Sequence, residues 1–108
     1  MILYFCYLDH TCLEQSTYYE GFDLKGGCGK QPYAWKRENP KECLLLCQQT
    51  DACELFTWIS PVHSWVGGRQ RCCLKYKANP HPTFQEGTVS GPKDCGNYCT
   101  IKYIFNLE

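Results

Sequence analysis

The chain has 108 residues, ten of them cysteine, and a formal net charge of zero from 11 Lys and Arg against 11 Asp and Glu. This length suits a single domain, and the balanced charge lacks the basic excess of most nucleic-acid-binding proteins, so we expect no nucleic-acid partner. The longest apolar runs are far below the roughly 18 residues of a membrane-spanning helix, so we expect no membrane insertion.

The cysteine content places this short chain among disulfide scaffolds. The number is even, so all ten thiols can pair. Reducing cytosol would not maintain such a set, and we expect a secreted protein or one on the extracellular surface. Residues 1–5 are too short for the roughly 7–15-residue apolar region of a signal peptide. We therefore expect the signal peptide to be missing from this sequence and Met1 to be an added start codon.

Extended segments are expected in the first third of the chain. Residues 2–8 are rich in aromatic and β-branched side chains and predict a strand. Residues 17–27 predict a short strand that ends in a glycine-rich turn, and residues 32–36 predict another extended piece.

One helix is predicted over residues 39–49. Asn39 is a good N-cap, and Pro40 suits the first helical position because its missing N–H would have no partner there. Cys43 and Cys47 are four residues apart, so they lie on one face of this helix. Both can therefore reach a sheet that packs on that face.

The second half of the chain predicts strands separated by long loops. We expect strands over residues 53–59, 71–77 and 98–106, a strand that runs into a turn over residues 88–95, and loops at 60–70 and 78–87. One helix with about five to seven short strands predicts an α+β domain with an antiparallel sheet.

Cys72 and Cys73 are adjacent on a predicted strand and must point to opposite faces of the sheet. Five cysteines could in principle supply thiolates to a zinc ion: Cys43, Cys47, Cys53, Cys72 and Cys73. The chain has no C-x-x-C pair of the kind that structural zinc sites usually present, so we favour disulfides and expect neither a metal nor a cofactor.

Catalytic signals are weak, and we expect the protein not to be an enzyme. Ser90 lies in GTVSG, which lacks the first glycine of a G-x-S-x-G nucleophile elbow. A lone catalytic cysteine does not fit the even cysteine count. The histidines, His10, His63 and His81, lie in loop-like surroundings and are expected at the surface.

Four segments follow one another over about residues 12–95: CLEQSTYYEGFDL, ECLLLCQQTDACELFTW, CCLK and GTVSGPKDC. In this order they resemble the PAN/Apple domain, the family of the apple domains of plasma prekallikrein, the N-terminal domain of hepatocyte growth factor and the microneme adhesins. The resemblance implies a single domain over residues 1–108, with a central helix cradled by a curved antiparallel sheet.

The resemblance also implies three disulfides. Cys12 would pair with Cys95, and Cys47 with Cys53. Cys43 would pair with Cys72, because Leu74 and Lys75 then take the L and K of the C-x-L-K motif of the family.

Four cysteines remain outside the family pattern. If the terminal cysteines of the family pair with each other, Cys6 and Cys99 lie on adjacent flanking strands, and we predict a Cys6–Cys99 disulfide. A Cys28–Cys73 disulfide is then left. Whether Cys28 pairs with Cys73 or with Cys72 stays open at this point. A bond from Cys28 to Cys72 would overturn the assignment.

The resemblance implies a binding module for proteins or carbohydrates. Two stretches are candidate ligand-binding sites: the loop around His63, Trp65, Arg69 and Arg71, and the segment with Trp35, Lys36 and Arg37. Lys75 and Lys77 would extend a basic surface along the strand. The alternatives are that Trp65 folds back onto the core, that the second segment is a half-buried strand, and that the lysines are merely solvated.

Two functions are therefore expected, and the sequence does not choose between them. The first is an extracellular recognition or adhesion module that binds a protein. The second is a lectin-like module that binds carbohydrate, including sulfated glycans held by the Arg and Lys clusters. The oligomeric state is not predicted.

Overall fold

The computed structural model describes residues 2–7, 12–95 and 98–103, with side chains described within 12–95. In these ranges the chain forms one α-helix and six strands: β1 (Ile2–Tyr7), β2 (Glu14–Tyr18), α1 (Pro40–Gln48), β3 (Leu55–Ile59), β4 (Cys72–Lys75), β5 (Thr83–Pro92) and β6 (Tyr98–Tyr103). Four 3₁₀ turns lie between them: η1 (Leu24–Gly26), η2 (Cys28–Lys30), η3 (Tyr33–Trp35) and η4 (Val66–Gly68). The predicted α+β class is confirmed.

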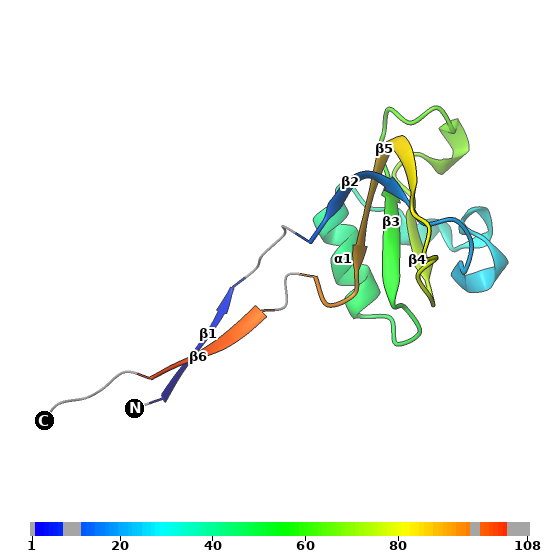
Figure 1. Ribbon diagram of the computed structural model, residues 1–108. Helices are drawn as coiled ribbons and strands as arrows, with labels where there is room; N and C mark the ends of the chain where they lie inside the picture. The colour runs from blue at the N-terminus through cyan, green and yellow to red at the C-terminus, as the bar shows by residue number, and fades with distance from the viewer. Residues whose placement is uncertain (1, 8–11, 96–97, 104–108) are drawn as a thin grey trace, which may run out of the picture.

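Four strands form an antiparallel sheet in the order β2-β5-β3-β4, and α1 lies against one face of it (Figure 1). The core fills the space between helix and sheet, where Phe56 and Trp58 of β3 pack with Leu74 of β4 and Leu44 of α1. The nine-residue α1 is too short to cross a membrane, and no other described helix is long and apolar enough to do so.

The helix begins where its sequence predicts. The Asn39 side chain accepts a hydrogen bond of 2.9 Å from the Glu42 N–H, and Pro40 is the first helical residue. This cap satisfies one of the backbone donors that every helix N-terminus leaves unpaired. Cys43 and Cys47 are both fully buried toward the sheet, as their spacing predicts.

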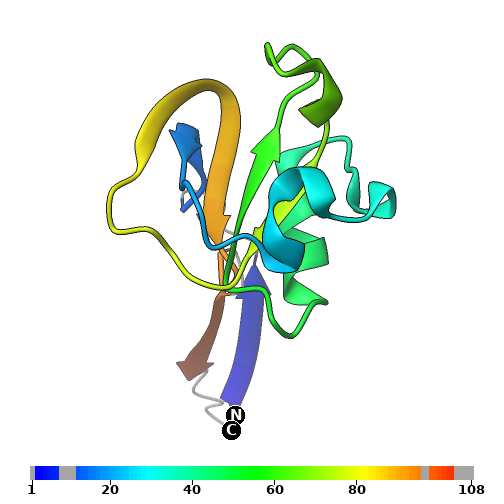
Figure 2. The same cartoon turned by 90° about the vertical axis from the view of Figure 1, so that its right-hand side faces the viewer.

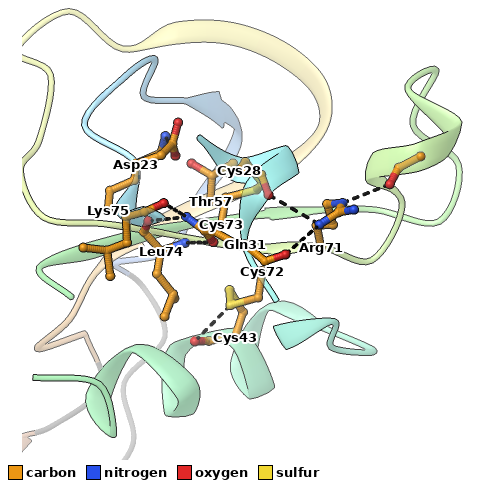
Figure 3. The surroundings of a disulfide bond; sticks show 12 residues. Asp23, Cys28, Gln31, Cys43, Thr57, Arg71, Cys72, Cys73, Leu74 and Lys75 are labelled. Atoms are coloured by element: carbon orange, nitrogen blue, oxygen red, sulfur yellow. Dashed lines mark hydrogen bonds and ion pairs between the residues drawn. A yellow bond between two sulfur atoms is a disulfide. The ribbon is translucent and has the colours of Figure 1, made fainter. Parts of the chain in front are cut away.

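Four disulfides connect the described cysteines: Cys12–Cys95, Cys28–Cys73, Cys43–Cys72 and Cys47–Cys53. These pairs agree with those expected from the sequence, and no described cysteine is free. Figure 3 shows Cys72 directed toward Cys43 on the helix. Cys73 belongs to a second apolar cluster with Cys28 and Ile59, on the opposite face of the sheet. Strand β4 is therefore cross-linked on both faces.

Strands β1 and β6 form a separate two-stranded antiparallel ribbon that extends away from the main sheet (Figures 1 and 2). The register places Cys6 opposite Cys99. Their side chains, and with them the predicted Cys6–Cys99 disulfide, lie outside the described residues. The same holds for His10 and for the end of the predicted strand after residue 103.

The short strand predicted at the start of residues 17–27 is only partly correct, whereas the chain does turn at the predicted glycine-rich stretch. Strand β2 lies earlier and ends at Tyr18. Five following residues have positive φ, which breaks an extended strand: Gly21, Phe22, Lys25, Gly26 and Gly27. The segment instead contains η1 and crosses the far face of the sheet, where Asp23 pairs with Lys75 in an isolated bridge.

Two other boundaries differ from the sequence prediction. Residues 32–36 are not extended but contain η3, closed by a 2.9 Å hydrogen bond from the Trp35 N–H to the Pro32 carbonyl. Strand β5 begins at Thr83, inside the predicted loop 78–87, because Thr83 pairs with Tyr18 beyond an irregularity in the β2–β5 register. Pairing with a distant strand overrides the local loop signal of this segment.

Lys75 was expected on an exposed basic surface, and that expectation is wrong. Its side chain is 0% exposed. The ammonium donates to Asp23 Oδ1 at 2.6 Å and to the Gly21 carbonyl at 3.1 Å, and it lies 5.0 Å from the centre of the Tyr18 ring. Because the segment carrying Asp23 covers this face of β4, Lys75 is a structural residue and not a ligand-binding one.

A glutamine side chain replaces a neighbouring strand at the outer edge of β4. The Gln31 amide donates to the Leu74 carbonyl at 2.8 Å and accepts from the Leu74 N–H at 3.0 Å (Figure 3). It also donates to the Leu24 carbonyl at 3.0 Å. Unpaired groups on an edge strand invite association with another chain, so Gln31 both satisfies and protects this edge.

We predict that Asp23→Asn destabilises the fold by about 3–5 kcal/mol, because it leaves a buried ammonium without its counter-ion. Guanidinium denaturation with the disulfides intact measures this change. Asp94→Asn, at an exposed position, is the matched control and should stay within about 0.5 kcal/mol of the parent. A similar small effect for both variants would contradict the structural role of the Lys75–Asp23 pair.

Candidate functional site

The loop between β3 and β4, residues 60–70, is organised around a buried histidine. His63 is only 8% exposed, so its expected surface position is wrong, whereas His81 is exposed as predicted. Its Nδ1 accepts the Trp65 backbone N–H at 2.9 Å, so the neutral ring carries its proton on Nε2, which lies 3.2 Å from Gln85 Oε1. The His63 carbonyl accepts Arg69 Nε at 2.9 Å. His63 and Arg69 therefore hold the loop in shape.

Trp65 is partly exposed at the surface of this loop, with 42% of its area accessible. Its ring lies directly over Gly68, where an added Cβ would overlap the ring atoms. The ring edge also approaches Gly29 of η2. Trp65 thus packs one face on glycine backbone and presents the rest to solvent. Gly68 permits this close approach because it has no side chain.

Arg71 joins the two loops that form this surface. Its Nε donates to the Gly67 carbonyl at 2.9 Å, and its Nη1 lies 3.4 Å from the carbonyls of Cys28 and Gln31 (Figure 3). The guanidinium carbon lies 5.9 Å from the centre of the Trp65 ring and 5.5 Å from the centre of the Tyr33 ring. Arg71 therefore sits near both rings at cation–π distance.

Tyr33, which the sequence did not single out, completes the cluster. It is 71% exposed, and Lys36 Nζ lies 3.2 Å from its hydroxyl and 4.3 Å from the ring centre. The hydrogen bond from Lys36 lowers the pKa of Tyr33 below its usual value of 10.0, with further contributions from the Lys36 and Arg71 charges. Cationic groups thus lie near the Tyr33 ring from two parts of the chain, Lys36 from its own segment and Arg71 from the end of the Trp65 loop.

The other residues of the second candidate segment point elsewhere. Trp35 packs against the hydrophobic core. Arg37 folds back onto its own segment, since Nη1 donates to the carbonyls of Ala34 and Lys36 at 2.6 and 2.7 Å. The Arg37 carbonyl accepts the indole N–H of Trp58 at 2.9 Å, which ties the segment to the core. Only Lys36 of this group joins the surface.

We call Tyr33, Lys36, Trp65 and Arg71 the aromatic–cationic surface. Val62 and Val66 of the Trp65 loop add apolar side chains that are 84% and 67% exposed. A pocket of 190 Å³ adjoins it, lined by Tyr18, Cys28, Ile59, His63, Trp65, Cys73 and Gln85. This arrangement can stack on a planar or apolar group and attract a negative one. The described residues contain no group of three His, Cys, Asp or Glu placed to hold a metal ion.

Charge along the chain is segregated in a way that matches this surface. Residues 24–37 carry four Lys and Arg, residues 55–85 carry another four, and neither segment contains Asp or Glu. These two segments hold eight of the 11 cationic residues and supply all four members of the aromatic–cationic surface. The absence of acidic residues around Tyr33 is the sequence pattern that could have indicated its place in this surface. A single tyrosine gives no such indication by itself.

A scan of the chain against models of protein families finds no match. A search of curated proteins finds no relative either.

We predict that Gly68→Ala displaces the Trp65 ring, because the new methyl group would occupy the space of the ring. Contacts between the Trp65 indole and residue 68, measured by nuclear Overhauser effects, should be lost. Gly67→Ala is the matched control, since a Cβ there meets Trp65 Nε1 at an ordinary 3.5 Å. An unchanged Trp65 environment in Gly68→Ala would show that the ring does not rest on this glycine.

We predict that Lys36→Met raises the pKa of Tyr33. Methionine keeps an apolar side chain of similar length but neither donates a hydrogen bond to the phenolate nor carries a charge. A pH titration that follows the Tyr33 ¹³Cζ resonance measures the shift. Lys41→Met on α1 should leave this titration unchanged. Equal titrations in the parent and in Lys36→Met would place Lys36 away from the phenol.

Proposed function

We propose that the protein is an extracellular recognition module of the PAN/Apple type that binds a protein partner through the aromatic–cationic surface. The observation that carries this proposal is the exposure of Trp65 and Tyr33 on either side of Arg71. Trp, Tyr and Arg are the residues most enriched among those that dominate the energy of protein interfaces.

The architecture supports the PAN/Apple assignment. One helix packs on a four-stranded antiparallel sheet, and the pairs Cys12–Cys95, Cys43–Cys72 and Cys47–Cys53 are those that the family resemblance implies. Four disulfides among the described residues also suit an oxidising, extracellular location. A fold does not fix a ligand, so the choice of partner depends on the surface itself.

The apolar character of the Trp65 loop favours a protein over a carbohydrate. Val62 and Val66 are highly exposed beside Trp65, and their burial would stabilise a protein interface but would gain little from a hydroxyl-rich sugar. The adjoining 190 Å³ pocket can accept a small side chain of the partner. His63 and Arg71 hold the loop in place before binding, which lowers the entropic cost of association.

Carbohydrate binding is the second candidate, and one observation favours its sulfated form. The surface carries the cations Lys36 and Arg71, and the two segments that build it contain no carboxylate. Such a surface would attract sulfate groups, and an exposed Trp65 could stack on a sugar ring. Ion pairs with a sulfated chain would be screened by salt, whereas apolar contacts with a protein would not.

The test pairs a glycan array with a binding screen against secreted and cell-surface proteins. We expect a protein partner whose affinity falls at least about 30-fold in Trp65→Ala, the loss typical of a central interface residue. Leu45→Ala, at an exposed position of α1 on the other side of the sheet, is the control and should bind normally.

Two outcomes would contradict the proposal. Full affinity of Trp65→Ala for the partner would show that the Trp65 loop is not the binding site. Binding to sulfated glycans alone, with affinity that falls as salt rises, would favour the lectin-like function instead.

A further inference from the structure

A second hollow lies at the other end of the same sheet face. It is a groove of 470 Å³ lined by eight residues: Glu14, Tyr19, Glu54, Leu55, Tyr76, Lys77, Ala78 and Pro92. Leu55, at the start of β3, lines this groove, while Ile59, at the end of β3, lines the pocket beside Trp65. Residues four apart on a strand share a face and lie roughly 13 Å apart. The two hollows are therefore separate sites on one face.

The groove has an apolar floor and aromatic walls. Leu55 and Pro92 are paired across β3 and β5 and form adjoining parts of the lining. The Tyr76 ring is half exposed and packs edge-on against Phe22, with 5.8 Å between ring centres. Tyr19 supplies the second aromatic side chain. A ligand that fits between these walls would need an apolar section of its own.

Two carboxylates give the groove its charge. The Tyr19 hydroxyl donates to Glu14 Oε1 at 2.6 Å, and burial followed by this hydrogen bond raises the pKa of Tyr19 to about 12. The phenol therefore stays neutral and holds the Glu14 carboxylate in place. Glu54 is exposed in the lining and has no side-chain hydrogen bond among the described contacts.

The one lysine of the lining does not neutralise both acids. Lys77 Nζ lies 5.3 Å from the centre of the Phe22 ring, which it contacts as a cation–π partner. The nearby Lys75 is already paired with Asp23 beneath the surface. With two carboxylates and one ammonium, the groove carries a net charge of −1, opposite to the charge of the surface around Trp65.

We propose that this groove receives a lysine or arginine side chain of the protein partner, an inference that rests on the function proposed above. The aliphatic stem of such a side chain would lie on Leu55 and Pro92. Its cationic head would lie near the ring faces of Tyr19 and Tyr76 and pair with Glu54 and Glu14. The volume lies within the range of roughly 300–1,000 Å³ that is usual for ligand pockets.

The two sites together specify the partner surface. It would carry an apolar or acidic element for the aromatic–cationic surface and a basic side chain for the groove at the other end of the sheet face. Complementary charges at two fixed points select an orientation as well as a partner, since a reversed approach would bring like charges together.

The experiment titrates the ¹⁵N-labelled protein with Nα-acetyl-lysine methylamide and follows backbone amide shifts. We expect saturable shifts at Glu54, Leu55 and Tyr76, in the lining of the groove. Glu54→Gln should weaken binding about threefold to fivefold, and Lys77→Gln should strengthen it by a similar factor, as expected for exposed ion pairs. Nα-acetyl-arginine methylamide tests the guanidinium form.

Two control probes test whether the groove selects a cation over an apolar group or a sugar. Nα-acetyl-norleucine methylamide has the apolar stem without the charge and should bind far more weakly than the lysine probe. Equal binding of the two, or no shift at the groove with either cationic probe, would overturn the cation site. Shifts at the groove with methyl galactoside but not with the cations would assign it to a sugar and also overturn the inference.

The Trp65→Ala variant should bind the lysine probe as the parent does, because the groove lies at the other end of β3. Full partner affinity in a Glu14→Gln/Glu54→Gln double variant would overturn the groove inference and leave the Trp65 site standing. Loss of partner affinity in that variant, with an unchanged amide spectrum elsewhere, would support it.

Discussion

The covalent anchoring of β4 on both of its faces is the constraint on which the rest of the structure depends. Cys72 is linked to Cys43 of the helix, and Cys73, one residue later, is linked to Cys28 on the other side. Adjacent strand residues always point apart, so this pair fixes one layer to each face of the same strand. The helix and the η1–η2 segment can then pack on a sheet of only four strands. In so small a domain, cross-links supply stability that a larger core would otherwise provide.

The Cys28 link brings a segment with little regular structure into a defined position, and the pocket beside Trp65 depends on that position. The segment buries Lys75 against Asp23 and satisfies the edge of β4 through Gln31. Farther along the same segment, Tyr33 comes to lie beside Arg71, the residue that precedes β4. The aromatic–cationic surface is thus a product of the disulfide framework, although no cysteine takes part in recognition.

The two ends of this sheet face differ in charge while the whole chain is neutral. The surface around Trp65 is built from segments without carboxylates, whereas the groove beside Leu55 contains Glu14 and Glu54. Net charge therefore says little about what such a small module can recognise, because recognition depends on the local field over about ten ångströms. A chain with zero net charge can therefore have one surface that attracts anionic groups and another that attracts cationic groups.

The sequence by itself determined the features that depend on local pattern: the capped start of α1, the shared face of Cys43 and Cys47, and the opposed directions of Cys72 and Cys73. The helical and strand periods fix these without reference to the rest of the chain. Only the tertiary structure decided which polar side chains are buried. Lys75 and His63 look like surface residues in sequence, and Tyr33 gives no signal of its own. Their environments are set by segments distant along the chain that cover or approach them, and local sequence does not encode which segment that will be.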